Sequence, residues 1–135
     1  MKSTSKKTKK LTKSIENNRD KIIEIMMDAT YNALLTDFMD YHVVLDLNDD
    51  LEINNVFLQE TKENDNHKVY TIYSLKCSEQ IGDYLKEKIK ENEEYETIED
   101  YIYSKQYADV LNDILDGVIN GIKKDGLRWF LPTYL

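Results

Sequence analysis

The sequence predicts an α+β protein in which one helix is followed by three strands and then by two or three more helices. Near both ends of the chain, apolar residues recur every three or four positions, which is the period of an amphipathic helix. Between residues 42 and 76 the period changes to two, and β-branched and aromatic residues become frequent. We therefore expect a three-stranded antiparallel meander with the C-terminal helices packed on one face of the sheet.

The first 13 residues form a basic segment that we predict to be disordered. They contain one leucine and no acid, which is too little apolar surface to offset the entropy lost on ordering. Their side chains carry +6, and because the whole chain carries −8, residues 14–135 carry −14. The sequence thus divides into a disordered basic tail, 1–13, and a single acidic α+β domain, 14–135. The lysines of the tail are Lys2, Lys6, Lys7, Lys9, Lys10 and Lys13.

Residues from Ser14 to about position 40 predict the first helix of the domain. Ser14 is a suitable N-cap, and Glu16 lies in the first turn, where a negative charge is favourable. The methionines of the wide apolar face that follows are typical of adaptable core packing. The three strands are then predicted at His42–Leu47, Leu51–Leu58 and Lys68–Lys76.

The clearest helix of the sequence is predicted over Ile98–Lys124, after a shorter helix that Ser78 would cap. Ser104 is a second capping candidate inside the long segment, so both two and three C-terminal helices stay open. Gly126 is expected to end the long helix, and the apolar residues after it to dock on the core or, alternatively, on a partner. The apolar stripe of the long helix consists of Tyr107, Leu111, Ile114, Val118 and Ile122.

Two acidic stretches form the candidate binding surface. Six acids fall within the ten positions 91–100, around the predicted start of the long helix, and three aspartates at spacings of four and three follow on its polar face. Carboxylates on a rigid surface can imitate nucleic-acid phosphates, and tyrosines supply rigid contact area. The alternative is an ordinary solvated face. The candidate partner-binding residues are Glu91, Glu93, Glu94, Tyr95, Glu96, Glu99, Asp100, Tyr101, Tyr103, Asp109, Asp113 and Asp116.

These features predict a small acidic protein-binding module that acts stoichiometrically. The expected partner is a basic protein, such as one that handles nucleic acid, because complementary charge speeds and directs association. Lysine, asparagine, isoleucine and tyrosine are abundant, as in proteins encoded by AT-rich genomes. Together with the small size and the acidic charge, this composition is typical of an inhibitor encoded by a phage or mobile element, or of an immunity protein. The alternative function is a nucleic-acid-associated adaptor that holds phosphate with the lysines of residues 1–13.

The sequence shows no arrangement typical of an active site, so we expect neither enzymatic activity nor a cofactor or metal. Asp46, Asn48 and Asp50 have the spacing that opens a calcium loop, but Leu51 follows where such a loop needs glycine. The remaining candidate ligands and nucleophiles are scattered along the chain at His42, His67 and Cys77.

The location expected from the sequence is a reducing, cytoplasmic one without membrane contact. No apolar run reaches the roughly 18 residues of a membrane-spanning helix, and no apolar segment follows the N-terminal lysines as in a secretory signal. Cys77 is the only cysteine, so no internal disulfide can form. In a eukaryotic host the lysine run would serve as a nuclear import signal.

Overall fold

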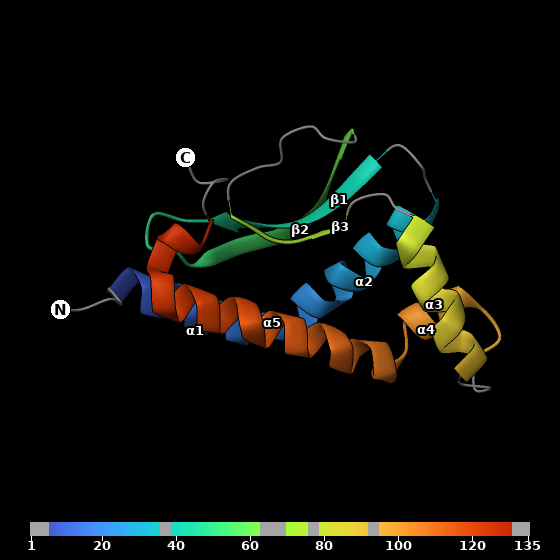
Figure 1. The fold of residues 1–135 in the computed structure, drawn as a ribbon. Helices are drawn as coiled ribbons and strands as arrows, with labels where there is room; N and C mark the ends of the chain where they lie inside the picture. Colours follow the sequence, from blue (N-terminus) through green and yellow to red (C-terminus); the bar gives the residue numbers. More distant parts are fainter. Residues whose placement is uncertain (1–5, 36–38, 63–69, 76–78, 92–94, 131–135) are drawn as a thin grey trace.

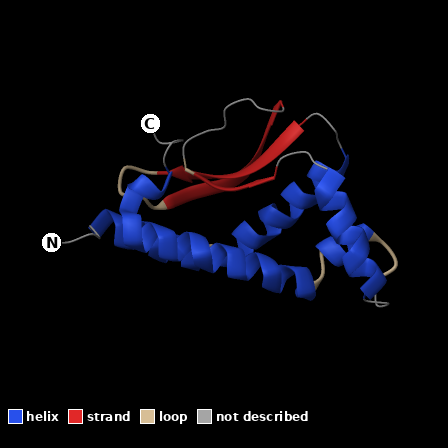
Figure 2. Ribbon diagram, in the orientation of Figure 1, coloured by secondary structure: helices blue, strands red, loops and turns tan. Residues whose placement is uncertain are grey.

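The computed structural model describes residues 6–35, 39–62, 70–75, 79–91 and 95–130, with the backbone alone for residues 79–82. The fold class is α+β as predicted: N-terminal helices come first, then three strands, then the C-terminal helices (Figures 1 and 2). The elements are α1 (Lys6–Asn17), α2 (Arg19–Leu35), β1 (Met39–Leu47), β2 (Ile53–Lys62), β3 (Thr71–Leu75), α3 (Glu79–Glu91), α4 (Ile98–Ile102), α5 (Lys105–Asp125) and the 3-10 helix η1 (Gly126–Phe130).

The three strands form one antiparallel sheet in the order β2-β1-β3, with the first strand in the middle. A meander would place the second strand in the middle, so that detail of the prediction is wrong. The reason lies in the composition of the strands, because six of the nine residues of β1 are apolar and only four of the ten residues of β2. Every residue of β1 from Asp40 to Leu45 is buried, whereas Val56 is the one buried residue of β2. The most apolar strand therefore takes the position that is paired along both edges, and the polar strand lies at an edge.

The helices pack on one face of this sheet (Figure 2). Tyr41, Val43 and Leu45 alternate along β1 and all belong to the hydrophobic core, so this is the face that the helices cover. α2 lies directly against it and contacts all three strands, and α5 lies against α1 and α2. The sheet, α2 and α5 together enclose the core.

The prediction of a disordered basic tail is wrong for residues 6–13, which form most of α1. Leu11 and Ile15 of this helix are fully buried, and α1 packs against α2, α5 and β2. The sequence signal was weak because Thr8 and Thr12, which are also buried, occupy two positions of the inward face. Threonines do not register as apolar, although their methyl groups can pack in a core. The packed body of the protein therefore begins before Ser14.

Each of the two long predicted helices is divided in two. The N-terminal one breaks at Asn18, whose side-chain amide donates a hydrogen bond to the Ser14 carbonyl at 2.8 Å. The C-terminal one breaks at Tyr103, and the Ser104 hydroxyl then caps α5 by accepting from the Tyr107 N–H at 3.2 Å. Three C-terminal α-helices result, which is one of the two numbers that the sequence left open.

Gly126 ends α5 as predicted. Its φ of 62° and ψ of −145° lie in a region that essentially only glycine adopts without strain. The chain then folds back as η1, which places Trp129 against Gly121 and buries Phe130. The ring of Phe130 meets that of Tyr70 edge to face, with 5.2 Å between the centroids. The expected docking of the C-terminal segment on the core is confirmed for η1, while residues 131–135 lie outside the described part.

Candidate functional site

The predicted acidic surface lies at the end of the molecule where α4 packs between α3 and the start of α5 (Figure 1). Two caps fix the backbone there. The Thr97 hydroxyl accepts a hydrogen bond from the Asp100 N–H at 3.1 Å and begins α4, and Ser104 begins α5. The carboxylates of this end are therefore carried by α4, the turn before it and the first half of α5, and the two caps fix where both helices begin.

Five carboxylates at this end are exposed, and none of them makes an ion pair or side-chain hydrogen bond with any described residue. They are Glu96, Glu99, Asp100, Asp109 and Asp113. Asp109 and Asp113 are one helical turn apart, so their like charges repel by a few tenths of a kcal/mol, roughly. A cationic partner would remove that repulsion. We call these five residues the acidic end.

Two of the candidate tyrosines are not free surface groups. Tyr101 is 1% exposed and belongs to the core, where its ring lies 5.3 Å from that of Tyr107 and 5.4 Å from that of Tyr95. Tyr95 is half-buried, and its hydroxyl donates to the Gln106 side-chain oxygen at 3.3 Å. Helical spacing alone did not distinguish these inward rings from outward ones. The ring of Tyr101 is packed in the core beneath the surface, so it cannot contact a partner.

Tyr103 is the candidate tyrosine that stays on the surface, with 43% of it exposed. Its hydroxyl donates to the Asp28 carboxylate at 2.8 Å, and its ring lies 6.0 Å from that of Tyr31. Partial burial, together with the hydrogen bond and the negative charge of Asp28, raises the pKa of the Tyr103 hydroxyl. Tyr103 therefore keeps its proton at neutral pH, and its ring is a rigid aromatic contact beside Glu99.

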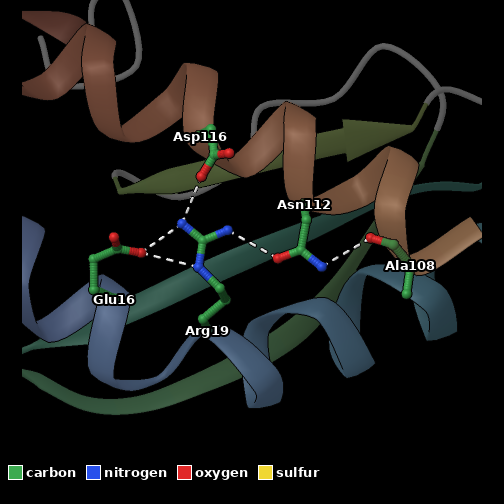
Figure 3. Close-up of polar contacts among 5 residues, drawn as sticks. All are labelled: Glu16, Arg19, Ala108, Asn112 and Asp116. Carbon is green, nitrogen blue, oxygen red and sulfur yellow. Dashed lines mark hydrogen bonds and ion pairs between the residues drawn. The ribbon is translucent and has the colours of Figure 1, made fainter. Parts of the chain in front are cut away.

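Asp116 is exposed, as predicted, but it is already paired within the protein. Figure 3 shows Arg19 between Glu16 and Asp116, with a further hydrogen bond to the side-chain oxygen of Asn112. The Arg19 nitrogens lie 2.6 Å from Asp116 and 2.8 Å from Asn112. The Asn112 amide in turn donates to the Ala108 carbonyl at 3.0 Å. This group of contacts ties the start of α2 to the middle of α5.

α3 contributes less negative charge than predicted, and it carries an exposed tyrosine that is not among the candidate residues. Glu91 is paired with Lys88 at 3.6 Å, and the neighbouring candidates Glu93 and Glu94 lie outside the described residues. Tyr84 is 45% exposed, with the Lys88 ammonium 5.5 Å from its ring centroid. The i, i+4 spacing of Tyr84 and Lys88 is the signal that could have placed the ring on the surface.

The basic segment that forms the alternative candidate site lies mostly on one helix, α1. Five of its six lysines lie on α1, and all five are exposed. None of the five is paired with an acid among the described residues, and Lys2 lies outside them. We call the five the lysine face: Lys6, Lys7, Lys9, Lys10 and Lys13.

The chemically versatile residues of the sheet serve the fold. His42 is 3% exposed, and its two ring nitrogens lie 2.8 Å from the Ser74 hydroxyl and 2.9 Å from the Thr61 hydroxyl. The imidazole thus bridges β3 and β2 from the central strand. The Asn48 side chain accepts from the N–H groups of Asp50 and Glu52, which closes the β1–β2 turn where a calcium loop had been considered. His67 and Cys77 lie outside the described residues.

Wider properties of the chain give no further indication of chemistry. No helix among the described residues is both long and apolar enough to span a membrane. The same part of the chain contains no cluster of three or more histidines, cysteines or acids arranged to hold a metal ion. Comparisons of the chain with protein-family models, curated proteins and solved structures found no match.

Proposed function

We propose that this protein acts by stoichiometric binding, and that its acidic end docks on a basic protein. The observation that carries the proposal is the set of five exposed carboxylates on α4, the turn before it and the first half of α5, none of them compensated by a described cation. Charges left uncompensated on rigid elements lose little entropy when a partner of opposite charge binds. Because these five residues are negatively charged, the partner that they fit is a basic protein.

Tyr103 adds a second requirement for the partner. A rigid aromatic ring that is half exposed and anchored through its hydroxyl offers apolar contact area at low entropic cost. A ring beside spaced carboxylates matches a surface that itself binds the bases and phosphates of nucleic acid. We therefore propose that the partner is a protein that handles nucleic acid, and that the protein inhibits it by covering that surface.

The test compares two variants that each lose four negative charges. The acidic-end variant carries Glu99→Gln, Asp100→Asn, Asp109→Asn and Asp113→Asn. The control carries the same kinds of change at four exposed acids on α2 and the β1–β2 turn: Asp20→Asn, Glu24→Gln, Asp49→Asn and Asp50→Asn. Immobilised wild-type protein and both variants are incubated with nuclease-treated lysate of the source cells, and retained proteins are identified by mass spectrometry.

The expected result is one basic protein that the wild type and the control retain in equal amounts and that the acidic-end variant retains at least tenfold less. Native mass spectrometry of the purified complex should give a fixed ratio of the two chains, and raising the salt concentration should release the partner. Equal retention by all three proteins, or retention by none, contradicts the proposed function.

A further inference from the structure

We propose that the lysine face of α1 is a second binding surface, and that it takes the phosphate backbone of a nucleic acid. This surface is independent of the acidic end and of its protein partner. The inference rests on three features of the described chain: the geometry of α1, the separation of the two charged surfaces, and the absence of exposed apolar side chains on α1.

The geometry of α1 puts all five lysines on one side of a packed helix. At 100° per residue they span about 160° of the helix circumference, and the buried positions lie opposite. From Lys6 to Lys13 the helix rises by about 10 Å, a length over which one strand of a duplex presents about three phosphates. Glu16, the one acid of α1, is engaged by Arg19. The positive charge of this face is therefore not neutralised within its own helix.

The two charged surfaces lie at opposite ends of the helical layer. α1 packs against α5, and its first turn lies at the end of the molecule where α5 finishes, far from α3 and α4 (Figure 1). Lys123 and Lys124 occupy that last turn of α5. From Asp113, the acidic-end residue nearest to that turn along α5, to Lys123 the helix rises by about 15 Å, roughly one and a half Debye lengths at 0.1 M salt. The acidic end is thus largely screened from a nucleic acid bound at α1, despite the net charge of −8.

The composition of the outer face favours nucleic acid over an anionic membrane. A helix that binds a membrane surface inserts exposed apolar side chains between its cationic ones. The apolar residues of α1, Leu11 and Ile15, are instead fully buried in the core. The exposed large apolar residues described elsewhere, such as Leu35 and Ile114, lie on other helices. α1 therefore offers charge without a membrane-inserting face.

The experiment measures binding of the full-length protein to a fluorescein-labelled 20-base-pair DNA duplex of arbitrary sequence, and to RNA of the same sequence, by anisotropy at 20–200 mM salt. One variant carries Lys7→Gln, Lys10→Gln and Lys13→Gln. The matched control carries Lys86→Gln, Lys90→Gln and Lys105→Gln, which removes three exposed lysines from α3 and the start of α5. Circular dichroism establishes that both variants keep the wild-type helix content.

The expected result is a loss of affinity of roughly tenfold or more at 50 mM salt for the α1 variant, and less than about threefold for the control. The slope of log affinity against log salt should fall by about 2–3 for the α1 variant alone. Binding to DNA and RNA alike identifies the backbone as the ligand. The inference is overturned if wild type shows no affinity for either duplex at 20 mM salt, or if both variants lose affinity equally. The acidic-end variant should bind the duplex at least as well as wild type, which separates this result from the test of the protein partner.

Discussion

Single side chains decide which predicted acids can meet a partner. Asp109, Asp113 and Asp116 follow the same helical spacing, yet only Asp116 is paired. Arg19, the first residue of α2, lies beside the middle of α5 and reaches Asp116 there. Side-chain ion pairs at an exposed site contribute about 0–1 kcal/mol each. The main effect of Arg19 is to connect three helices, since it also forms hydrogen bonds with Glu16 of α1 and Asn112 of α5. Periodicity identifies the exposed face of a helix. It does not show which of the charges on that face forms an ion pair with a residue far away in the sequence, such as an arginine 97 positions earlier.

A buried hydroxyl cluster predicts how stability changes at alkaline pH. The Thr30 hydroxyl donates to the Met26 carbonyl at 3.0 Å and lies 3.2 Å from the Tyr107 hydroxyl, with which it forms a buried hydrogen bond. Burial raises the pKa of Tyr107, and the hydroxyl of Tyr73 beside it adds to the shift. The folded protein therefore keeps this proton at a pH where the unfolded chain, with a tyrosine pKa near 10, loses it.

Tyr107→Phe should consequently lower stability at pH 7 by about 1 kcal/mol, through the lost hydrogen bond, and flatten the decline at high pH. The wild-type contribution is fully present below pH 10 and is lost as pH rises toward the folded-state pKa, at about 1.4 kcal/mol per pH unit. Urea denaturation from pH 7 to 11 measures both effects. Leu111→Ala, which is destabilising but leaves the tyrosine in place, should keep the wild-type slope. An unchanged slope in Tyr107→Phe would show that this proton is not linked to folding.

Among the elements, those with a complete apolar stripe were the most predictable. The stripe of α5 identified Tyr107, Leu111, Val118 and Ile122, all of which are buried, but it also included Ile114, which is 40% exposed. The buried face is rotated away from Ile114 toward Leu115 and Ile119, which are both buried. Strand order was not predictable from the strands one by one, because it depends on which of them is paired along both edges. The acidic end was found because it is local in sequence, and the Arg19 contacts were missed because they are not.

The two glycines of α5 provide a matched pair of substitutions within one helix. A Cβ added at Gly117 meets no atom within 4 Å, so Gly117→Ala should raise stability by up to about 1 kcal/mol through helix propensity. A Cβ added at Gly121 would overlap the indole of Trp129, so Gly121→Ala must displace η1 and should cost about 1–3 kcal/mol. Trp129 is the only tryptophan, and its emission should shift to longer wavelength in Gly121→Ala alone. Equal effects of the two substitutions would contradict the close packing of η1 on α5.

For the molecule as a whole, the position of α1 changes the meaning of its charge. A tail of six lysines on an acidic domain would be a mobile counterion to its own body. A packed α1 instead fixes five of those lysines at one end, while the uncompensated carboxylates gather at the other. The protein then has two surfaces of opposite charge that can be occupied together. Both proposals therefore depend on α1 being part of the core.

Leu11→Ala tests this dependence directly. Leu11 is fully exposed to solvent if residues 6–13 are disordered, but it is fully buried between helices in the structure. We expect Leu11→Ala to reduce the free energy of unfolding by about 2–4 kcal/mol, whereas Lys10→Ala on the outer side of the same turn should change it by less than about 0.5 kcal/mol. Urea denaturation at pH 7 measures both. If the two substitutions are equally silent, α1 is not packed, and the lysines return to a mobile segment that screens the acidic body without holding a nucleic acid at a fixed place.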